Sequence, residues 1–475
     1  MITSDEMAVV DRNAAALGVP TKQLMESSGN AIARVARELV PEGAEIALVC
    51  GRGNNGGDAF VAARFLTGYD VTVHLLGRPE TISTDIAREN WEALEQAELA
   101  TEVVRDSRDL ELGTPDLVVD AMLGTGITGE LREPEASAAA AINESDATVL
   151  AVDVPSGVDA DTGDGDGVEA DHVVTFHDEK PGLSKLDATV HVADIGIPAA
   201  AETFVERGDL LRLGRDPRSH KGDHGEVLVV GGGPYTGAPA LAAQAALRAG
   251  ADLVRVACPA SIAREVQGYD ENLILRPFEG ERLTPDAVPH IRTLAADHDV
   301  TLIGPGLGDD EATLDAVREF LFAFDGTGVV DADALQVVPD VETEATLLCT
   351  PHQGELRRMG GPASDGWRER RELVEAFASE IGHTLLVKGA YDIISDGDRT
   401  RVSKTGNPGM TVGGTGDVLA GAASALACPL SPVNAGGVAA YANGRAGDAV
   451  VARQGYGLTA TDLVSELPKA LRFEE

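Results

Sequence analysis

Short apolar runs rich in β-branched residues alternate with alanine-rich stretches along the whole chain. The runs that read as strands cover residues 45–50, 71–76, 117–119, 148–152 and 172–175 in the first half, and in the second half they include 226–230, 253–257, 301–303, 328–330, 346–349 and 384–387. Strands that alternate with helices in this way predict parallel sheets with helices on both faces. The expected fold class is therefore α/β.

A polar segment interrupts this alternation near the middle of the chain. Residues 211–223, LRLGRDPRSHKGD, lack apolar periodicity, and a new strand-like run then leads into Gly231, Gly232 and Gly233. A chain of 475 residues is long enough for two or three domains, each with its own core. We expect two domains, at residues 1–212 and 215–475. Their glycine-rich segments differ, so we see no internal repeat.

Composition describes a strongly acidic folded protein. The chain has 38 Lys and Arg residues against 78 Asp and Glu residues, a formal net charge of −40, and 43 % of its residues are hydrophobic. That apolar share is too high for a disordered acidic tail. A salt-adapted source explains the acidic surface, because salt screens the repulsion between carboxylates. The same charge argues against nucleic acid and anionic membranes as partners.

Cysteine usage and the N-terminal segment suggest a cytoplasmic location. The four cysteines lie far apart, and three of them end strand-like runs, which predicts buried free thiols. The first ten residues, MITSDEMAVV, are acidic where a signal peptide is basic. No segment has eighteen uninterrupted apolar residues. We therefore expect a soluble, cytoplasmic protein.

The densest glycine segment is GNPGMTVGGTGDVLAG, at residues 406–421. Closely spaced glycines let backbone N–H groups converge, and the helix that follows adds its partial positive charge, so the segment predicts an anion hole for phosphate. Asp417 would repel a phosphate there unless it does chemistry, such as taking a proton from a hydroxyl. A glycine-rich turn with an acid near the helix start is the alternative. The chain lacks a G-x-x-x-x-G-K-[ST] loop, so this segment is the candidate phosphate site.

A second glycine-rich segment follows the run at residues 45–50. Gly51, Gly53 and Gly56 satisfy the dinucleotide fingerprint G-x-G-x-x-G. The acid that reads ribose is missing, because the next strand-like run ends in Gly77 and Arg78. Asp58 would also repel a pyrophosphate at the helix start. An ordinary Rossmann dehydrogenase is therefore disfavoured.

Two further polar loops, at residues 120–126 and 153–157, also follow strand-like runs. Open α/β sheets place ligands at such strand ends, so the loops would meet the glycine-rich segment at one edge of the sheet. An oxygen-rich cluster without His or Cys suits a hard cation better than zinc. Three loops at separate places are the alternative. The cluster would hold Asn54, Asn55, Asp58, Asp120, Asp153 and Ser156.

The first half resembles the NAD(P)H-hydrate epimerase family, the YjeF N-terminal domain, over about residues 1–212. The resemblance is carried by LMESSG, VCGRGNNGGDAFVAARFL, VVDAMLGTG and AVDVPSGVDADTG, with Ala59 where a glycine is usual. It implies a Rossmann-like three-layer sandwich that inverts C6 of the hydrated nicotinamide with the help of K⁺. By resemblance, Asn55, Asp120 and Ser156 hold the ion, and Asp153 is the candidate for proton transfer. The implied substrate-binding residues are Asn54, Asn55, Gly56, Gly57, Asp58, Gly124, Thr125, Gly126, Ile127, Thr128, Gly129, Glu130 and Asp153.

The second half resembles the ADP/ATP-dependent NAD(P)H-hydrate dehydratase family over about residues 215–475. The matching motifs are VLVVGGGPYTGAPALAAQAALRAGADLVRVA, LIGPGLG, VVDADAL, TPHQGEL, LVKGAYDII and GNPGMTVGGTGDVLAG, with Gln353 where proline is usual and Thr411 where alanine is common. The resemblance implies a ribokinase-like α/β domain that uses ADP or ATP and Mg²⁺. It implies Asp417 as the catalytic residue, substrate contacts from Ala251, Gly306, His352 and Asp417, and nucleotide contacts from Lys388, Gly389, Ala390, Tyr391, Asp392, Gly413, Gly414, Thr415 and Gly416.

Taken together, the two resemblances imply a bifunctional repair enzyme for damaged nicotinamide nucleotides. The first domain would interconvert the R and S epimers of NADHX and NADPHX, the hydrated forms of NADH and NADPH. The second would phosphorylate the S epimer and eliminate phosphate, because phosphate leaves more easily than hydroxide. We also expect a homo-oligomer. One alternative is a ribokinase-type kinase for a vitamin alcohol or sugar, which would share the anion hole and Asp417 but would not explain the fused first domain. The other is a protein in which one domain has become a binding or oligomerisation module.

Overall fold

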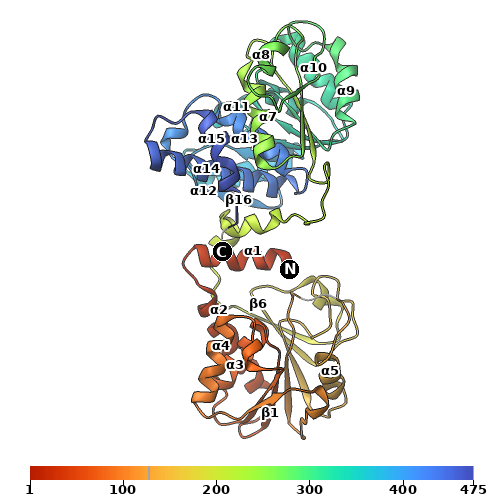
Figure 1. The fold of residues 1–475 in the computed structure, drawn as a ribbon, viewed down its shortest axis with the longest axis vertical. Coiled ribbons are helices and arrows are strands. Elements are labelled where there is room, and N and C mark those ends of the chain that lie inside the picture. The colour runs from red at the N-terminus through yellow and green to blue at the C-terminus, as the bar shows by residue number, and fades with distance from the viewer. Residues whose placement is uncertain (127–128, 474–475) are drawn as a thin grey trace. The chain divides into compact units, whose positions relative to one another are not determined.

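The computed structural model describes residues 1–126 and 129–473 and divides into two compact units (Figure 1). The first unit is Met1–Ala201 and the second is Glu202–Glu475. Each unit has its own wholly or largely parallel sheet and its own hydrophobic cores, so the expected α/β fold class is confirmed.

The first unit is a seven-stranded, all-parallel sheet between two layers of helices. Its strand order is β3-β2-β1-β4-β5-β6-β7, and the order reverses between β1 and β4, where open α/β sheets place ligands. The helices α2, α3 and α4 cover one face and α5 covers the other (Figure 1). The strands are β1 (Glu45–Cys50), β2 (Asp70–Leu76), β3 (Thr101–Val104), β4 (Leu117–Ala121), β5 (Thr148–Val152), β6 (His172–Phe176) and β7 (Thr189–Ala193), and the helices are α1 (Ser4–Ala16), α2 (Thr21–Leu39), α3 (Asn54–Phe65), α4 (Asp85–Gln96) and α5 (Glu135–Asn143). The short helix α6 (Ala200–Thr203) contains the boundary between the two units.

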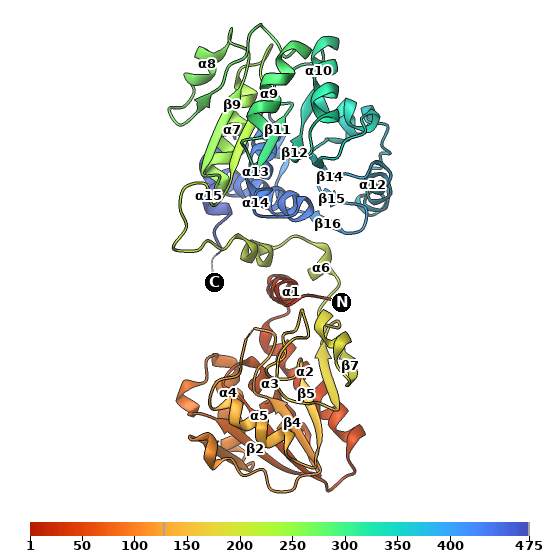
Figure 2. The ribbon, with the colours of Figure 1, turned by 90° about the vertical axis from the view of Figure 1, so that its right-hand side faces the viewer.

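The second unit has a nine-stranded sheet in the order β10-β9-β8-β11-β12-β13-β14-β15-β16. It is parallel up to β14, and β15 and β16 then continue it as an antiparallel pair beside α12 (Figure 2). The strands are β8 (Glu226–Val230), β9 (Leu253–Ala257), β10 (Ile274–Leu275), β11 (Val300–Ile303), β12 (Thr327–Val330), β13 (Thr346–Cys349), β14 (Thr384–Val387), β15 (Asp392–Ser395) and β16 (Thr400–Ser403).

Helices cover both faces of this second sheet. One core joins the sheet to α7, α13, α14 and α15, and the other joins it to α9, α10, α11 and α12. Their bounds are α7 (Gly237–Ala249), α8 (Ala263–Gln267), α9 (Val288–Ala295), α10 (Glu311–Phe322), α11 (Gln353–Arg358), α12 (Trp367–Ile381), α13 (Thr415–Leu426), α14 (Pro432–Gln454) and α15 (Ala460–Ala470).

The division between the units lies earlier than the polar segment suggested. Residues 202–212, which we assigned to the first domain, belong to the second unit. Phe204 forms a bridge with Val402 of β16, and a buried ion pair joins Asp209 to Arg401 at 2.9 Å. These contacts anchor the segment on the second sheet, although its sequence has no strand-like pattern.

The cysteines and the helices of the structure bear on two expectations from the sequence: buried free thiols and the absence of a membrane span. Cys50, Cys258 and Cys349 are buried free thiols, as predicted, and Cys428 is partly buried. Among the helices that the structure describes, none combines the length and apolar character needed to cross a membrane.

Candidate active sites

The first unit has a cavity of about 650 Å³ at the carboxyl edge of its sheet. The loops after β1, β4 and β5 all contribute to it, so the three polar loops meet at one place as predicted. Helix α2 adds Leu24, Met25 and Ser28 from the LMESSG motif, and helix α1 adds Met7 and Asp11, which no motif indicated. Of the predicted residues, the cavity wall contains Asn54, Asn55, Asp58, Gly124, Thr125, Gly126 and Asp153.

Asp153 is the centre of this cavity's polar network. It follows β5 with a φ of 66°, a left-handed conformation that is strained for a residue with a side chain. Its carboxylate lies 3.0 Å from the ammonium of Lys180, whose side chain is fully buried. The Thr175 hydroxyl donates to the same carboxylate at 3.1 Å. Lys180 was missed by sequence analysis, and its only signal is that this chain contains few lysines.

Two more carboxyl groups, those of Asp11 and Asp58, line the same cavity as Asp153. Burial, with the nearby Asp153 charge, raises the pKa of Asp11 to about 6. Burial and the charges of Asp153 and Asp11 raise the pKa of Asp58 well above its usual range. Asp11 comes from α1, where a polar residue on an amphipathic helix gave no sign of function. These three acids and Lys180 therefore share this cavity, and burial raises the pKa of two of the acids, Asp11 and Asp58.

Asp120 and Ser156 form a buried oxygen cluster behind this cavity. The Ser156 hydroxyl donates to Asp120 Oδ1 at 2.6 Å, and the Ser156 N–H donates to Oδ2 at 2.8 Å. Burial raises the pKa of Asp120 to about 6, although these hydrogen bonds oppose the rise. The carbonyl of Leu123 accepts from the Asn55 amide at 2.9 Å, which brings Asn55 to the same cluster.

This cluster suits a monovalent or other hard cation. Asp120 is wholly buried, and no cationic side chain pairs with it among residues 1–126 and 129–473. A buried carboxylate without a counter-charge is costly, so a bound cation would stabilise it. Oxygen atoms from Asn55, Asp120 and Ser156 are the donor type that hard cations prefer. The residues therefore fit the K⁺ that the resemblance implies.

The remaining predicted residues of the first unit have other positions. Gly56 is required by packing, because a Cβ there would lie 2.1 Å from the Gly51 carbonyl oxygen. A Cβ on Gly57 would lie 2.8 Å from the terminal methyl of Met25 and 2.9 Å from the Cβ of Ala87. Gly129 and Glu130 line a neighbouring cavity of about 720 Å³ instead of the first one. Ile127 and Thr128 lie outside the described residues.

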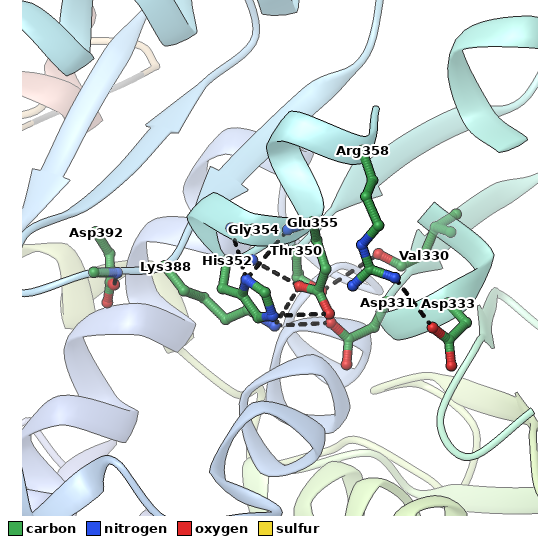
Figure 3. A network of polar contacts seen from close by, with 11 residues as sticks. Val330, Asp331, Asp333, Thr350, His352, Gly354, Glu355, Arg358, Lys388 and Asp392 are labelled. Carbon is green, nitrogen blue, oxygen red and sulfur yellow. Dashed lines mark hydrogen bonds and ion pairs between the residues drawn. The ribbon is translucent and has the colours of Figure 1, made fainter. Parts of the chain in front are cut away.

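In the second unit, a lysine and two acids meet at the carboxyl edge of the sheet (Figure 3). Lys388, which follows β14, lies 3.0 Å from Asp331 after β12 and 3.7 Å from Glu355 of α11. The Thr350 hydroxyl donates to the same oxygen of Asp331 at 2.7 Å. Burial opposes the charge of Lys388, yet the carboxylates of Asp331 and Glu355 raise its pKa. Lys388 is thus a fixed cation in a site rather than a surface lysine.

Asp417 lies beside this lysine in the first turn of α13. Gly414 caps the helix with a φ of 93°, which only glycine adopts without strain. A Cβ on Gly416 would lie 3.4 Å from the Lys388 ammonium. Burial, and then the charge of Asp331, raise the pKa of Asp417 to about 7, while Lys388 opposes the rise. An acid with this pKa can act as a general base near neutral pH.

His352 has two roles at this edge. Its Nδ1 accepts hydrogen bonds from the N–H groups of Gly354 at 2.9 Å and Glu355 at 3.2 Å, so it caps α11. The carboxylate of Glu355 accepts in return from the His352 N–H at 2.7 Å. The ring also lines the adjoining cavity. His352 therefore caps α11 and also lies at the site, where the resemblance implies a substrate contact.

That adjoining cavity, of about 700 Å³, collects most of the predicted nucleotide-binding residues. Asp392, whose carboxylate accepts from the Gly389 N–H at 2.8 Å, has its pKa raised to about 7 by burial. Tyr391 does not line the cavity and stacks on Trp367 instead, with ring centroids 5.2 Å apart. Gly413 and Gly414 belong to the loop before α13 but not to the cavity wall. The wall does contain Lys388, Gly389, Ala390, Asp392, Thr415 and Gly416.

The two remaining predicted substrate contacts differ in position. Gly306 follows β11 at the carboxyl edge with a φ of 72°, and a Cβ there would lie 2.8 Å from the Tyr235 carbonyl oxygen. Ala251 lies buried in the turn between α7 and β9, at the amino end of that strand. The structure therefore does not bring Ala251 together with His352, Lys388 and Asp417, all of which gather at the opposite edge.

An acid and a lysine at the carboxyl edge of each sheet define a two-part α/β enzyme. Residues 227–469 match the family model described as NAD(P)H-hydrate dehydratase, and residues 21–182 match the one described as YjeF-related protein N-terminus. The chain belongs to the family of bifunctional NAD(P)H-hydrate repair enzymes.

Curated relatives match along nearly the full chain. A bifunctional NAD(P)H-hydrate repair enzyme from Methanothermobacter thermautotrophicus is 44 % identical over 98 % of this chain and 94 % of the relative. One from Pyrobaculum aerophilum is 43 % identical over 99 % of this chain and 98 % of the relative. A solved structure, the ADP/ATP-dependent NAD(P)H-hydrate dehydratase from Bacillus subtilis co-crystallised with ATP/Mg²⁺, is 26 % identical with a TM-score of 0.50, covering 57 % of this chain and 99 % of that one.

Proposed function

We propose that the chain repairs hydrated NADH and NADPH in two steps, with one step in each unit. The observation that carries this proposal is the full-length match to bifunctional repair enzymes, together with the acid that each unit places in its site. Asp153 would act in epimerisation, and Asp417 would act in the dehydration that ADP or ATP drives.

In the first unit, epimerisation needs a group that both takes and returns a proton. Asp153 is in contact with Lys180 and faces Asp11 and Asp58 in one cavity, so a proton can be held at several oxygens. Asn55, Asp120 and Ser156 would hold K⁺, which would supply positive charge beside a buried carboxylate. The loops at residues 54–58 and 124–126 would hold the hydrated nicotinamide half of the substrate.

In the second unit, Asp417 would take the proton from the hydroxyl on C6 of the S epimer. The hydroxyl oxygen then attacks the terminal phosphorus of the nucleotide, which leaves AMP from ADP or ADP from ATP. Loss of a proton from C5 and cleavage of the C6–O bond release phosphate and restore the double bond. Lys388 and the backbone N–H groups of Gly413–Gly416 would offset the charge that develops on the phosphoryl oxygens.

Magnesium would enter this site with the nucleotide. Within the described ranges of the chain, no three His, Cys, Asp or Glu residues gather as a metal site. Mg²⁺ commonly uses one or two carboxylates together with substrate phosphates. Asp331, already bound to Lys388, and Asp333 would serve at most as supporting ligands.

The decisive experiment supplies a mixture of R and S NADHX, with and without ADP or ATP. With nucleotide, we expect the absorbance of reduced nicotinamide to recover completely, because epimerisation feeds the R form to the dehydratase. Without nucleotide, we expect the R to S ratio to equilibrate with no recovery of absorbance. A stable phosphorylated product in place of NADH would contradict the proposal and favour a small-molecule kinase.

Expectations about partners and location stay predictions. We expect small molecules as the substrates, neither nucleic acid nor membrane as a partner, and a cytoplasmic location. Self-association into a homo-oligomer can be measured by light scattering over a range of protein concentrations.

A further inference from the structure

Arg52 lies where two cavities of the first unit share a wall. It follows β1 and lines both the 650 Å³ cavity that contains Asp153 and the 720 Å³ cavity beside it. Leu123, Gly124 and Glu135 also line both. An elongated ligand that occupies both cavities must therefore pass Arg52.

The arginine is held in place from its backbone outward. Its carbonyl oxygen accepts hydrogen bonds from the Ser83 N–H at 2.8 Å and the Ser83 hydroxyl at 3.0 Å. Its side-chain stem lies on Gly77, where a Cβ would be 2.8 Å from Arg52 Cδ. These contacts fix the backbone and the stem, so the guanidinium has a defined position at the shared wall.

The guanidinium itself is available to a ligand. Its side chain is 42 % exposed, and its ion pair with Glu135 is a long one at 4.0 Å. Within residues 1–126 and 129–473, the structure gives the guanidinium no hydrogen bond. A planar guanidinium has five N–H donors that match phosphate geometry, and an arginine at a cavity wall with those donors unused is suited to a phosphate.

The other charged side chains that line the Asp153 cavity are mostly acidic, so a cation there is important for binding a phosphate. Among the described residues that line the Asp153 cavity, the acids are Asp11, Asp58, Glu135 and Asp153, and the only cations are Arg52 and Lys180. Lys180 is fully buried and paired with Asp153, so it cannot reach a phosphate. The neighbouring cavity adds Arg132 as a second cation, but among the described residues that line both cavities the only cation is Arg52. A pyrophosphate at the shared wall would therefore lie beside Glu135 with Arg52 as its counter-charge.

We infer that Arg52 binds the pyrophosphate of the dinucleotide substrate, with the hydrated nicotinamide half in the Asp153 cavity and the adenosine half in the neighbouring one. This inference rests on the proposed epimerase function. It makes Arg52 a residue that selects dinucleotides over substrates without phosphate, and it gives Arg52 no part in the chemistry at C6.

The test combines a change in the enzyme with a change in the substrate. Arg52→Gln is made in the full chain, and epimerisation is followed by chromatography without ADP or ATP, so that the dehydratase stays idle. One substrate is R-NADHX and the other is the hydrate of reduced nicotinamide riboside, which has no phosphate. Arg78→Gln is the matched control, because Arg78 is exposed, follows the neighbouring strand and lines neither cavity.

For R-NADHX, we expect Arg52→Gln to raise KM about tenfold to hundredfold with kcat within about twofold, since a hydrogen-bonded charge pair is lost. For the riboside hydrate, kcat/KM should stay within about twofold of wild type. Arg52→Lys should restore part of the KM effect, because lysine keeps the charge but loses the paired donors. ADP-ribose should inhibit the wild type and lose most of that inhibition in Arg52→Gln, whereas inorganic phosphate should inhibit neither.

Other results would overturn the inference. An unchanged KM for R-NADHX, or equal losses with both substrates, would show that Arg52 does not bind the pyrophosphate. Inhibition of the wild type by inorganic phosphate as strong as by ADP-ribose would show a site for free phosphate. If Arg52→Gln does not fold, the Arg52→Lys comparison and the ADP-ribose inhibition of the wild type still decide. A wild type that does not epimerise R-NADHX would refute the proposed function instead.

Discussion

The first unit places its lysine on the acid that we assign to proton transfer, whereas the second unit places its lysine on a different acid. Lys180 lies 3.0 Å from Asp153, and Lys388 lies 3.0 Å from Asp331, with Asp417 next to both. The surroundings differ as well. Asp153 is held at a strand end by a left-handed backbone, and Asp417 lies in the first turn of a helix.

This difference matches the two reactions. Epimerisation returns its proton, so a cluster in which Asp11 and Asp58 have raised pKa values beside a lysine-paired Asp153 is suited to exchange. Phosphoryl transfer needs a base that takes the hydroxyl proton without returning it to the same oxygen. It also needs a cation that offsets the negative charge of the phosphate. Asp331 and Glu355 hold Lys388 in position. Asp417, whose pKa is raised to about 7, is left unpaired with the lysine and can act as the base. The two sites thus differ in the acid that pairs with the lysine: the proposed proton-transfer acid in the first unit, and an acid other than the proposed base in the second.

Removing the base of the second site should give the largest effect. Asp417→Asn should lower dehydration of S-NADHX by about 10²–10⁴-fold, because general-base catalysis contributes about that much. ADP should still bind through the cavity that Lys388 and Gly416 line. The measurement is absorbance recovery from pure S epimer, with ADP binding followed by calorimetry. Epimerisation by the same variant is the control, and near wild-type dehydration would refute the role of Asp417.

Removing the buried carboxylate of the first site should affect only epimerisation. Asp120→Ala deletes the acceptor of two Ser156 hydrogen bonds and the charge of the proposed K⁺ site. We expect epimerisation to fall about tenfold to hundredfold at fixed KCl, as expected when a hydrogen-bonded charge is lost, with a higher KCl concentration needed for half-maximal rate. Dehydration of pure S epimer should be unchanged. A parallel loss of both activities would contradict two independent sites.

Acid pH should slow dehydration through Asp417. Its raised pKa of about 7 means that the carboxylate becomes protonated as pH falls through 7, and a protonated acid cannot act as the base. We therefore expect kcat/KM for S-NADHX to fall about tenfold per pH unit below pH 7 and to level off above it. Asp392, whose pKa is also raised to about 7, lines the same cavity. The acid limb should persist in Asp392→Asn, and its disappearance there would reassign the titration.

Most of the two sheets could be predicted from apolar runs, because buried parallel strands are continuous apolar segments. The runs at 45–50, 148–152, 226–230 and 384–387 agree with β1, β5, β8 and β14 to the residue. Edge strands were missed. β3 and β7 are half-exposed and contain polar residues such as Glu102 and His191, so nothing in the pattern distinguished them from loops.

The sites were predictable where glycine-rich motifs follow strands and were missed elsewhere. Asp153 and Lys388 both follow runs that the pattern identified. Asp11 and Lys180 lie in segments without a motif, and only tertiary packing brings them to the cavity. Ala251 shows the converse, because it was assigned by motif position alone and lies at the other edge of its sheet.

Salt should separate the two units by stability, with the smallest effect of those predicted here. Residues 1–201 contain 13 Lys and Arg against 37 Asp and Glu, a net charge of −24, and residues 202–475 contain 25 against 41, a net charge of −16. The first unit has the larger charge on the shorter chain, so its carboxylates repel more strongly when screening is weak. Raising KCl from about 50 mM to about 2 M shortens the screening length to a few ångströms.

We therefore expect KCl to raise both unfolding temperatures, the first unit's more than the second's. For units of this size, about 1 kcal/mol shifts Tm by about 2–4 °C, so a gain of a few kcal/mol would be readily measured. The chain has two tryptophans, Trp91 in the first unit and Trp367 in the second. Fluorescence of Trp367→Phe and Trp91→Phe variants therefore reports each unit separately. NaCl at equal ionic strength gives the same screening, so any extra gain with KCl in the first unit would indicate K⁺ bound near Asp120. Equal shifts in both units would contradict the charge argument, and no shift in either would refute salt adaptation.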